Sequence, residues 1–196
     1  KVSFPAEFHA QTAVEAALSL HPTVKDRLDR VRRIRITTQE SALRIIDKKG
    51  PLRNPADRDH CLQYAVAVAL IYGDLRAEHY EDETARDPRI DRLRELMELE
   101  EDARYSADYL DPEKRSIANS VQVFFDDGSC TEKTAVEYPL GHTSRRAEAL
   151  QPLFSKLRRN LSGQLIEGRA EAVVDLFQDR ERLYVMTVPQ LMDMFL

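Results

Sequence analysis

The residues best suited to acid–base chemistry or anion binding gather where an apolar stretch begins, in the run NPADRDHCLQYAVAVALIYG, residues 54–73. His60 and Tyr64 are four residues apart, so on one helix they would share a face, one turn from each other. Both side chains can donate a proton, and the first turn of a helix favours negative charge because its backbone N–H groups are unpaired. The preceding loop adds a local positive excess, from Lys48, Lys49, Arg53 and Arg58. This pattern predicts a pocket for a ligand with several carboxylates.

The same residues also have a purely structural interpretation. Asp57 or Asp59 could cap the helix, and Tyr64 could be a core aromatic whose hydroxyl is satisfied. The basic residues would then be solvated. Spacing alone does not decide between the two interpretations.

Two further helix starts carry residues of the same kinds. The segment just before and at the start of the first expected helix contains Lys1, Glu7 and His9. A later helix opens with His142, Arg145 and Arg146, where cations oppose the helix dipole and so require another reason, such as a bound anion. The simpler alternatives are a capping or surface histidine at the first position and a solvated helix face at the second.

Composition and charge exclude several classes of protein. The chain has 196 residues, 42% of them hydrophobic and 32% charged, with a net charge of −5. That balance suits one domain, or one domain with a helical appendage, and gives no reason to expect a nucleic acid or a membrane as partner. The sequence has only six glycines and contains no nucleophile elbow or phosphate-binding loop. Acid–base chemistry and anion binding are the candidate functions that remain.

Cysteine usage indicates a reducing, cytoplasm-like compartment and no metal site. Only Cys61 and Cys130 occur, and neither belongs to a metal-ligand spacing. We expect both to be reduced core residues, the first in the apolar helix and the second on a strand.

Periodicity predicts an α+β fold, with a small open sheet that includes a β-hairpin packed on helices, followed by an all-helical C-terminal segment. The hairpin signal is Asp127-Gly128 between two alternating runs, and residues 31–37 alternate as a half-exposed strand. Helices are expected at residues 5–21, 41–47, 60–73, 88–99, 145–160, 164–178 and 188–195.

Several longer runs resemble the MmgE/PrpD family. They are KVSFPAEFHAQTAVEAA, RIIDKKGPLRNPADRDHCLQYAVAVAL, YEDETARDPRIDRLRE, YLDPEKRSIANSVQVFFDDGS and VEYPLGH. The resemblance covers nearly the whole chain, most strongly residues 1–143. It implies that residues 1–143 are the α+β C-terminal domain of a longer protein and that residues 144–196 are a helical tail. That tail would rejoin an N-terminal helical domain outside this sequence.

The activity that this resemblance implies is loss of water from 2-methylcitrate, giving 2-methylaconitate, in the methylcitrate cycle of propionate catabolism. It implies no metal or other cofactor, a homodimer, and a small tricarboxylate as substrate. Such an elimination needs a base, an acid and cationic groups that hold the carboxylates. A decarboxylase acting on cis-aconitate, another lyase or isomerase of the family, and a dimerising domain without catalysis remain alternatives.

The resemblance also implies roles for particular residues. Lys1 matches the family lysine before a Phe/Tyr-Pro pair, and Tyr64 matches the tyrosine that opens the apolar helix. Glu7 and Gln11 stand where related cis-aconitate decarboxylases carry histidines, while His9 is this sequence's own, which favours a dehydratase. The expected catalytic residues, in one shared cleft, are Lys1, His9, His60 and Tyr64. The expected substrate-binding residues are Lys48, Arg53, Arg58, His142 and Arg145.

Overall fold

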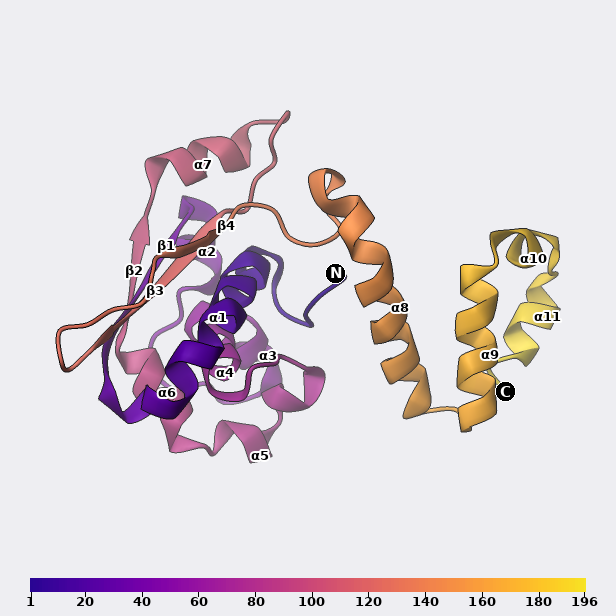
Figure 1. The fold of residues 1–196 in the computed structure, drawn as a ribbon, viewed down its shortest axis with the longest axis horizontal. Coiled ribbons are helices and arrows are strands. Elements are labelled where there is room, and N and C mark those ends of the chain that lie inside the picture. Colours follow the sequence, from indigo (N-terminus) through magenta and orange to yellow (C-terminus); the bar gives the residue numbers. More distant parts are fainter.

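A four-stranded mixed sheet organises the first part of the chain (Figure 1). The computed structural model describes the backbone of residues 1–196 and every side chain except that of Glu167. The strands are β1 (Val31–Thr38), β2 (Met97–Glu101), β3 (Asn119–Phe125) and β4 (Thr134–Val136), in the order β2-β1-β3-β4. Strand β1 runs parallel to β2 and antiparallel to β3, and β3 and β4 form the predicted hairpin. The α+β prediction is confirmed.

The sheet is one-sided, as the alternation in β1 predicts. Ile34, Ile36 and Val123 are fully buried on one face. On the other face, the guanidinium of Arg33 lies 4.2 Å from the ring centroid of Phe124. Helices therefore need to cover only one side of the sheet.

The remaining elements are helical. The first part of the chain contains η1 (Phe8–Ala10), α1 (Gln11–Val24), η2 (Lys25–Arg30), α2 (Glu40–Ile46), α3 (Pro55–Asp59), α4 (Leu62–Tyr72), η3 (Ala77–Tyr80), α5 (Asp82–Ala85), α6 (Pro88–Glu95) and α7 (Ala103–Leu110). The second part contains η4 (Thr143–Arg145), α8 (Arg146–Ser162), α9 (Glu167–Gln178), α10 (Arg180–Val185) and α11 (Val188–Asp193). Helix α1 packs against α4, β3 and β4, and α4 also packs against α6. Every residue of α4 except Tyr72 is buried, which explains why its sequence is apolar all round.

The expected helix over residues 60–73 is shorter at its start. Asn54 caps α3, whose first residue is Pro55, and α3 ends at Asp59, with His60 as its C-terminal cap. Cys61 then adopts extended angles (φ −127°, ψ 109°) before α4 begins at Leu62. The prediction that His60 and Tyr64 share one helix face is therefore wrong, because the chain bends between them.

Two other expectations are also wrong. Met97 was expected in a helical stripe, but the helix ends at Glu95 and residues 97–101 form β2, since Met97 pairs with Ile34 of β1. The run MELEE also alternates with period two, so pairing with a neighbouring strand decides its conformation. Cys130 is exposed in the turn region of the hairpin, whereas Cys61 is buried as expected.

Gly73 ends α4 in a left-handed conformation that leaves no space for a side chain. Its φ is +68°, and a Cβ would lie 2.8 Å from two atoms of the His21 ring. Gly50 has a similar φ of +82° but open space around it. We expect Gly73→Ala to lower the free energy of unfolding by about 1–2 kcal/mol more than Gly50→Ala, since both carry the backbone strain and only one carries the clash. Equal losses in urea denaturation would show that the His21 contact does not matter.

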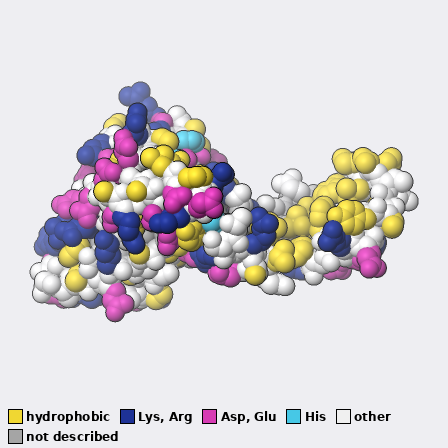
Figure 2. All heavy atoms as spheres, turned by 90° about the horizontal axis from the view of Figure 1, so that it is seen from above, with side chains coloured by type: hydrophobic (Ala, Val, Ile, Leu, Met, Phe, Trp, Pro, Cys, Tyr) yellow, Lys and Arg dark blue, Asp and Glu magenta, His cyan; other side chains and the backbone are white. Residues whose placement is uncertain are grey.

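The last helices extend away from the sheet (Figure 1) and carry much exposed apolar surface (Figure 2). Exposed side chains on α10 and α11 include Tyr184, Val185, Val188 and Met192. None of the described helices is long and apolar enough to cross a membrane. An apolar surface of this kind is typical of a face that packs against another protein surface.

Candidate functional site

A cavity of about 790 Å³ lies where the N-terminus meets the loop before α8, and we call it the N-terminal pocket. Its charged residues are Lys1, Arg115 and Arg146, and His142 also lines it. Among the described side chains that line it, none is Asp or Glu. The rest of its wall is largely apolar, with Phe8, Leu110, Ile117 and Leu140 among its members. This pocket therefore combines an excess of positive charge with surfaces that suit methyl or methylene groups.

A line of hydrogen-bonded side chains ends at the wall of this pocket. The Glu7 carboxylate accepts from the backbone N–H of His9 at 2.7 Å and lies 2.9 Å from His9 Nδ1. On its other side, His9 Nε2 lies 3.1 Å from the hydroxyl oxygen of Tyr109, which lines the pocket. Burial would raise the pKa of Glu7, but hydrogen bonds and electrostatic attraction from His9 outweigh it and lower the pKa. Glu7 is thus held as a carboxylate that orients His9.

The lowered pKa of Glu7 makes a pH-dependent contribution to stability. Because the folded pKa lies below the ordinary value of 4.5, this contribution is present above that value and is lost as the pH falls through the folded pKa. We expect Glu7→Gln to lower the free energy of unfolding by about 1–2 kcal/mol at pH 7, and by much less at pH values below the folded pKa. Urea denaturation at several pH values measures this. Glu113→Gln is the matched control, since Glu113 is exposed and no ion pair of its side chain is found among the described residues. A loss for Glu7→Gln that does not vary with pH would contradict the role of its charge.

Arg115 has the backbone strain often found at functional sites. Its φ of 48° is the one positive φ of a non-glycine residue in the part of the chain that the structure describes. Its backbone N–H donates to the carbonyl of Asp111 at 2.8 Å, which closes the turn after α7. This turn brings Arg115 to the wall of the N-terminal pocket.

A second cavity, of about 320 Å³, lies beside the start of α4, and we call it the arginine pocket. Arg53, Arg58, Arg86 and Arg94 line it together with Tyr64, Asp82 and Asp91. The Tyr64 hydroxyl donates to the carbonyl of His79 at 2.6 Å, and burial raises the pKa of Tyr64 to about 12. The Arg58 guanidinium donates to the carbonyl of Tyr80 and to the Asp82 carboxylate, both at 2.6 Å. The polar ends of Tyr64 and Arg58 are thus already bound within the protein.

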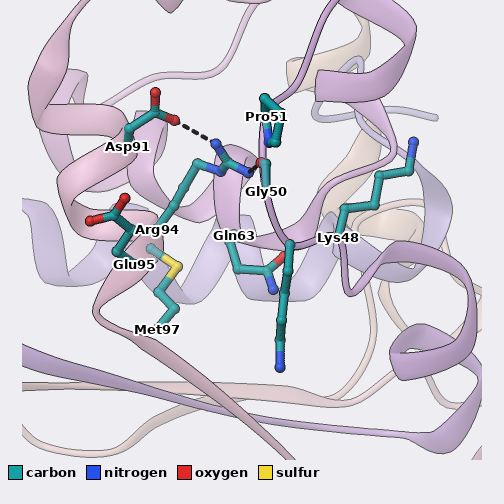
Figure 3. Close-up of a pocket in the computed structure, with 9 residues that line it drawn as sticks. Lys48, Gly50, Pro51, Gln63, Asp91, Arg94, Glu95 and Met97 are labelled. Carbon is teal, nitrogen blue, oxygen red and sulfur yellow. Dashed lines mark hydrogen bonds and ion pairs between the residues drawn. The ribbon is translucent and has the colours of Figure 1, made fainter.

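A third cavity, of about 610 Å³, adjoins the loop before α3, and we call it the loop pocket (Figure 3). Arg94 lies at its centre, between Asp91 and the backbone of Gly50, and donates to the Gly50 carbonyl at 2.8 Å. Lys48 lines this pocket and forms an ion pair of 3.3 Å with Asp57. Acidic and basic groups are mixed here, so the pocket has a weaker positive excess than the N-terminal pocket.

The structure divides the predicted site residues among these places. Lys1 and His142 line the N-terminal pocket, and His9 stands behind its wall. Arg53, Arg58 and Tyr64 line the arginine pocket, and Lys48 lines the loop pocket. The expected single cleft shared by Lys1, His9, His60 and Tyr64 is not formed among the described residues.

Besides His9, two predicted site residues line none of the three pockets. His60 is exposed, and its Nδ1 lies 3.3 Å from the Ala56 carbonyl oxygen. Arg145 is held by Glu15 and Glu148, each at 2.9 Å. Its neighbour Arg146 is the residue that reaches the N-terminal pocket.

Besides Arg146, the N-terminal pocket residues Tyr109 and Arg115 are absent from the predicted set. Tyr109 is one hundred residues from His9 in the sequence, so no local spacing could connect them. Both residues lie in the run YLDPEKRSIAN that contributes to the family resemblance. That resemblance was the one signal that could have drawn attention to them.

Comparisons with known proteins agree with the resemblance. The 2-methylcitrate dehydratase of Salmonella typhi is 50% identical over 200 residues, which cover 100% of this chain and 41% of that protein. That of Escherichia coli (strain K12) is 47% identical over 199 residues, with the same two coverages. The mitochondrial 2-methylcitrate dehydratase of Yarrowia lipolytica is 48% identical over 198 residues, or 38% of its length. The chain therefore spans about two fifths of the length of these relatives.

The family model for the MmgE/PrpD C-terminal domain matches residues 4–180. That range includes all of the sheet and the helices through α9. Because the match covers most of the sequence, the chain belongs to the MmgE/PrpD family.

Proposed function

We propose that the native protein carrying this chain dehydrates 2-methylcitrate to 2-methylaconitate, and that the N-terminal pocket holds the substrate's carboxylates. The substrate comes from the names of relatives that are about half identical to this chain over its whole length. The structural observation that carries the proposal is the pocket's set of three cations, with no acidic residue among its described lining side chains.

The chemistry of the pocket suits a methylated tricarboxylate. Lys1, Arg115 and Arg146 offer one cation for each of three carboxylates. Arginine can bind a carboxylate through two parallel N–H groups, which fixes its orientation as well as its charge. The apolar wall around Ile117 and Leu140 would receive the methyl group. The arginine pocket fits less well, since Asp82 and Asp91 offset two of its four arginines.

Arg146 provides a direct test of carboxylate binding. We expect Arg146→Gln in the native protein to raise KM for 2-methylcitrate by at least about tenfold and to change kcat little, since a lost charged hydrogen bond costs about 1.5–3 kcal/mol. Arg159→Gln is the matched control, because Arg159 is exposed on the same helix and lines none of the three pockets. An unchanged KM for Arg146→Gln would remove Arg146 from the binding site.

Product analysis separates the proposed reaction from its alternatives. The native protein should be incubated with 2-methylcitrate, citrate and cis-aconitate, and the products followed by NMR. We expect 2-methylaconitate from 2-methylcitrate. Release of carbon dioxide from cis-aconitate would instead assign a decarboxylase, and no conversion of any of the three would favour a dimerising domain without catalysis.

We also propose that residues 144–196 pack against a helical domain preceding this chain in the native protein, and that the protein is a homodimer. The exposed apolar side chains of α10 and α11, such as Val185 and Val188, support a covered surface there.

We propose the cytoplasm as the location of the protein, since the free thiols of Cys61 and Cys130 suit a reducing compartment. Cell fractionation tests this location, and light scattering tests the proposed homodimer.

A further inference from the structure

Glu7, His9 and Tyr109 form a line from the protein interior to the N-terminal pocket. The side chains of Glu7 and His9 are 13% and 9% exposed. Tyr109 is half-buried at the wall of the pocket. Of these three residues, Tyr109 is therefore the one that a bound ligand can touch.

The hydrogen bonds fix where the protons lie. A carboxylate can only accept, so in a neutral imidazole the proton is on His9 Nδ1, facing Glu7, and Nε2 carries a lone pair. The hydroxyl of Tyr109 must then donate to Nε2 across the 3.1 Å contact. The same logic, in which a carboxylate orients a histidine that accepts a proton from a hydroxyl, operates in hydrolase triads.

We propose that Tyr109 is a catalytic residue that removes a proton from the ligand in the N-terminal pocket, with His9 and Glu7 as positioning residues behind it. This inference rests on the proposed dehydration. As the carbon–hydrogen bond next to the substrate's hydroxyl-bearing carbon breaks, its proton passes to the Tyr109 oxygen. The hydroxyl proton of Tyr109 passes to His9 Nε2, and Glu7 stabilises the resulting imidazolium.

The remaining atoms balance within the same reaction. The electron pair of the broken carbon–hydrogen bond forms the carbon–carbon double bond, and the bond to the hydroxyl group breaks. The hydroxide takes one proton from the solvent and leaves as water, while His9 returns one proton to the solvent, so no net proton is gained. Lys1, Arg115 and Arg146 line the same pocket and would stabilise the negative charge that grows on the substrate as its proton leaves.

The first test uses the native protein and 2-methylcitrate. We expect Tyr109→Phe to lower kcat about 100-fold, within the range for loss of a general base, and to leave KM within about threefold. It should slow exchange of the substrate's carbon-bound proton with deuterated solvent to the same extent. The matched control is Tyr105→Phe, since Tyr105 is buried on the same helix and no hydrogen bond of its hydroxyl is found among the described residues. If Tyr109→Phe has the same kcat and the same proton-exchange rate as Tyr105→Phe, the inference is overturned. The proposed function would not be affected by that result.

The second test does not depend on turnover. Nitrogen NMR of the His9 ring in this 196-residue chain should find the proton on Nδ1 and a bare Nε2. Tyr109→Phe should shift the Nε2 signal, and citrate added as a probe should shift it in the parent chain but not in the Tyr109→Phe variant. If the native protein does not convert 2-methylcitrate, the proposed function fails. A proton on Nε2, or a signal that Tyr109→Phe and citrate leave unchanged, overturns the inference whatever the outcome with 2-methylcitrate.

Discussion

A protein made only of these 196 residues is expected to convert 2-methylcitrate at least about a thousandfold more slowly than a complete dehydratase relative, because an elimination depends on preorganised groups in a site that excludes water. The cations of the N-terminal pocket, Lys1, Arg115 and Arg146, are all exposed. Water therefore screens their charges and weakens their hold on a carboxylate.

The separation of the candidate residues gives the second reason. Lys1 and Tyr109 line one pocket, while Tyr64 lines another and its hydroxyl is bound to the His79 carbonyl. Base, acid and carboxylate clamps must converge on one substrate, and small misplacements already cost large factors in rate. Within this chain, the described pockets do not bring Tyr64 to the cations of the N-terminal pocket.

The measurement compares purified proteins at equal concentration. The 196-residue chain and the complete Escherichia coli relative are incubated with 2-methylcitrate, and product is followed by NMR. Urea denaturation establishes that the chain is folded, so that inactivity is not caused by unfolding. Turnover by the chain at a rate close to that of the relative would mean that its own residues suffice for the reaction.

Arg58→Ala is expected to lower the free energy of unfolding by about 3 kcal/mol, because it removes two charged hydrogen bonds and leaves a buried carbonyl without its donor. Arg58 is 5% exposed, and its guanidinium connects the end of α3 to the Tyr80 carbonyl and to Asp82 at the start of α5. We therefore expect a loss of stability, whereas the sequence suggested that this arginine binds substrate.

Arg53→Ala is the matched control for that variant. Arg53 lines the same pocket and is exposed, and no hydrogen bond of its side chain is found among the described residues. Its loss should change the free energy of unfolding by less than about 0.5 kcal/mol. Nearly equal stabilities for the two variants would contradict the structural role of Arg58. If Arg58→Ala, but not Arg53→Ala, also raised KM for 2-methylcitrate, Arg58 would be assigned to substrate binding as well.

Elements that depend on neighbours in the sequence were predicted well. Asp127-Gly128 specifies the turn between β3 and β4, and Gly73 specifies the end of α4 through its left-handed conformation. The alternation of isoleucine and arginine in β1 indicated a sheet with one solvated face. Each of these signals acts within a few residues, so one sequence is enough to reveal it.

Features that depend on distant contacts were missed. Met97 belongs to a strand because it pairs with Ile34, and a helical stripe in the sequence could not reveal that partner. Tyr109 reaches His9 only because the fold brings α7 beside the start of α1. The chain likewise bends between His60 and Tyr64 because α3 is a separate helix with its own cap. The four-residue spacing of these two residues therefore gave the wrong relative orientation of their side chains.

The position of bound substrate is the most direct test of the proposed site. The native protein carrying Tyr109→Phe, which should bind 2-methylcitrate but turn it over slowly, is crystallised with that substrate. We predict carboxylates within hydrogen-bond distance of Arg146 and Lys1, and the reacting carbon beside the ring of residue 109. A substrate bound instead in the arginine pocket, against Tyr64 and Arg86, would show that the N-terminal pocket is not the substrate site.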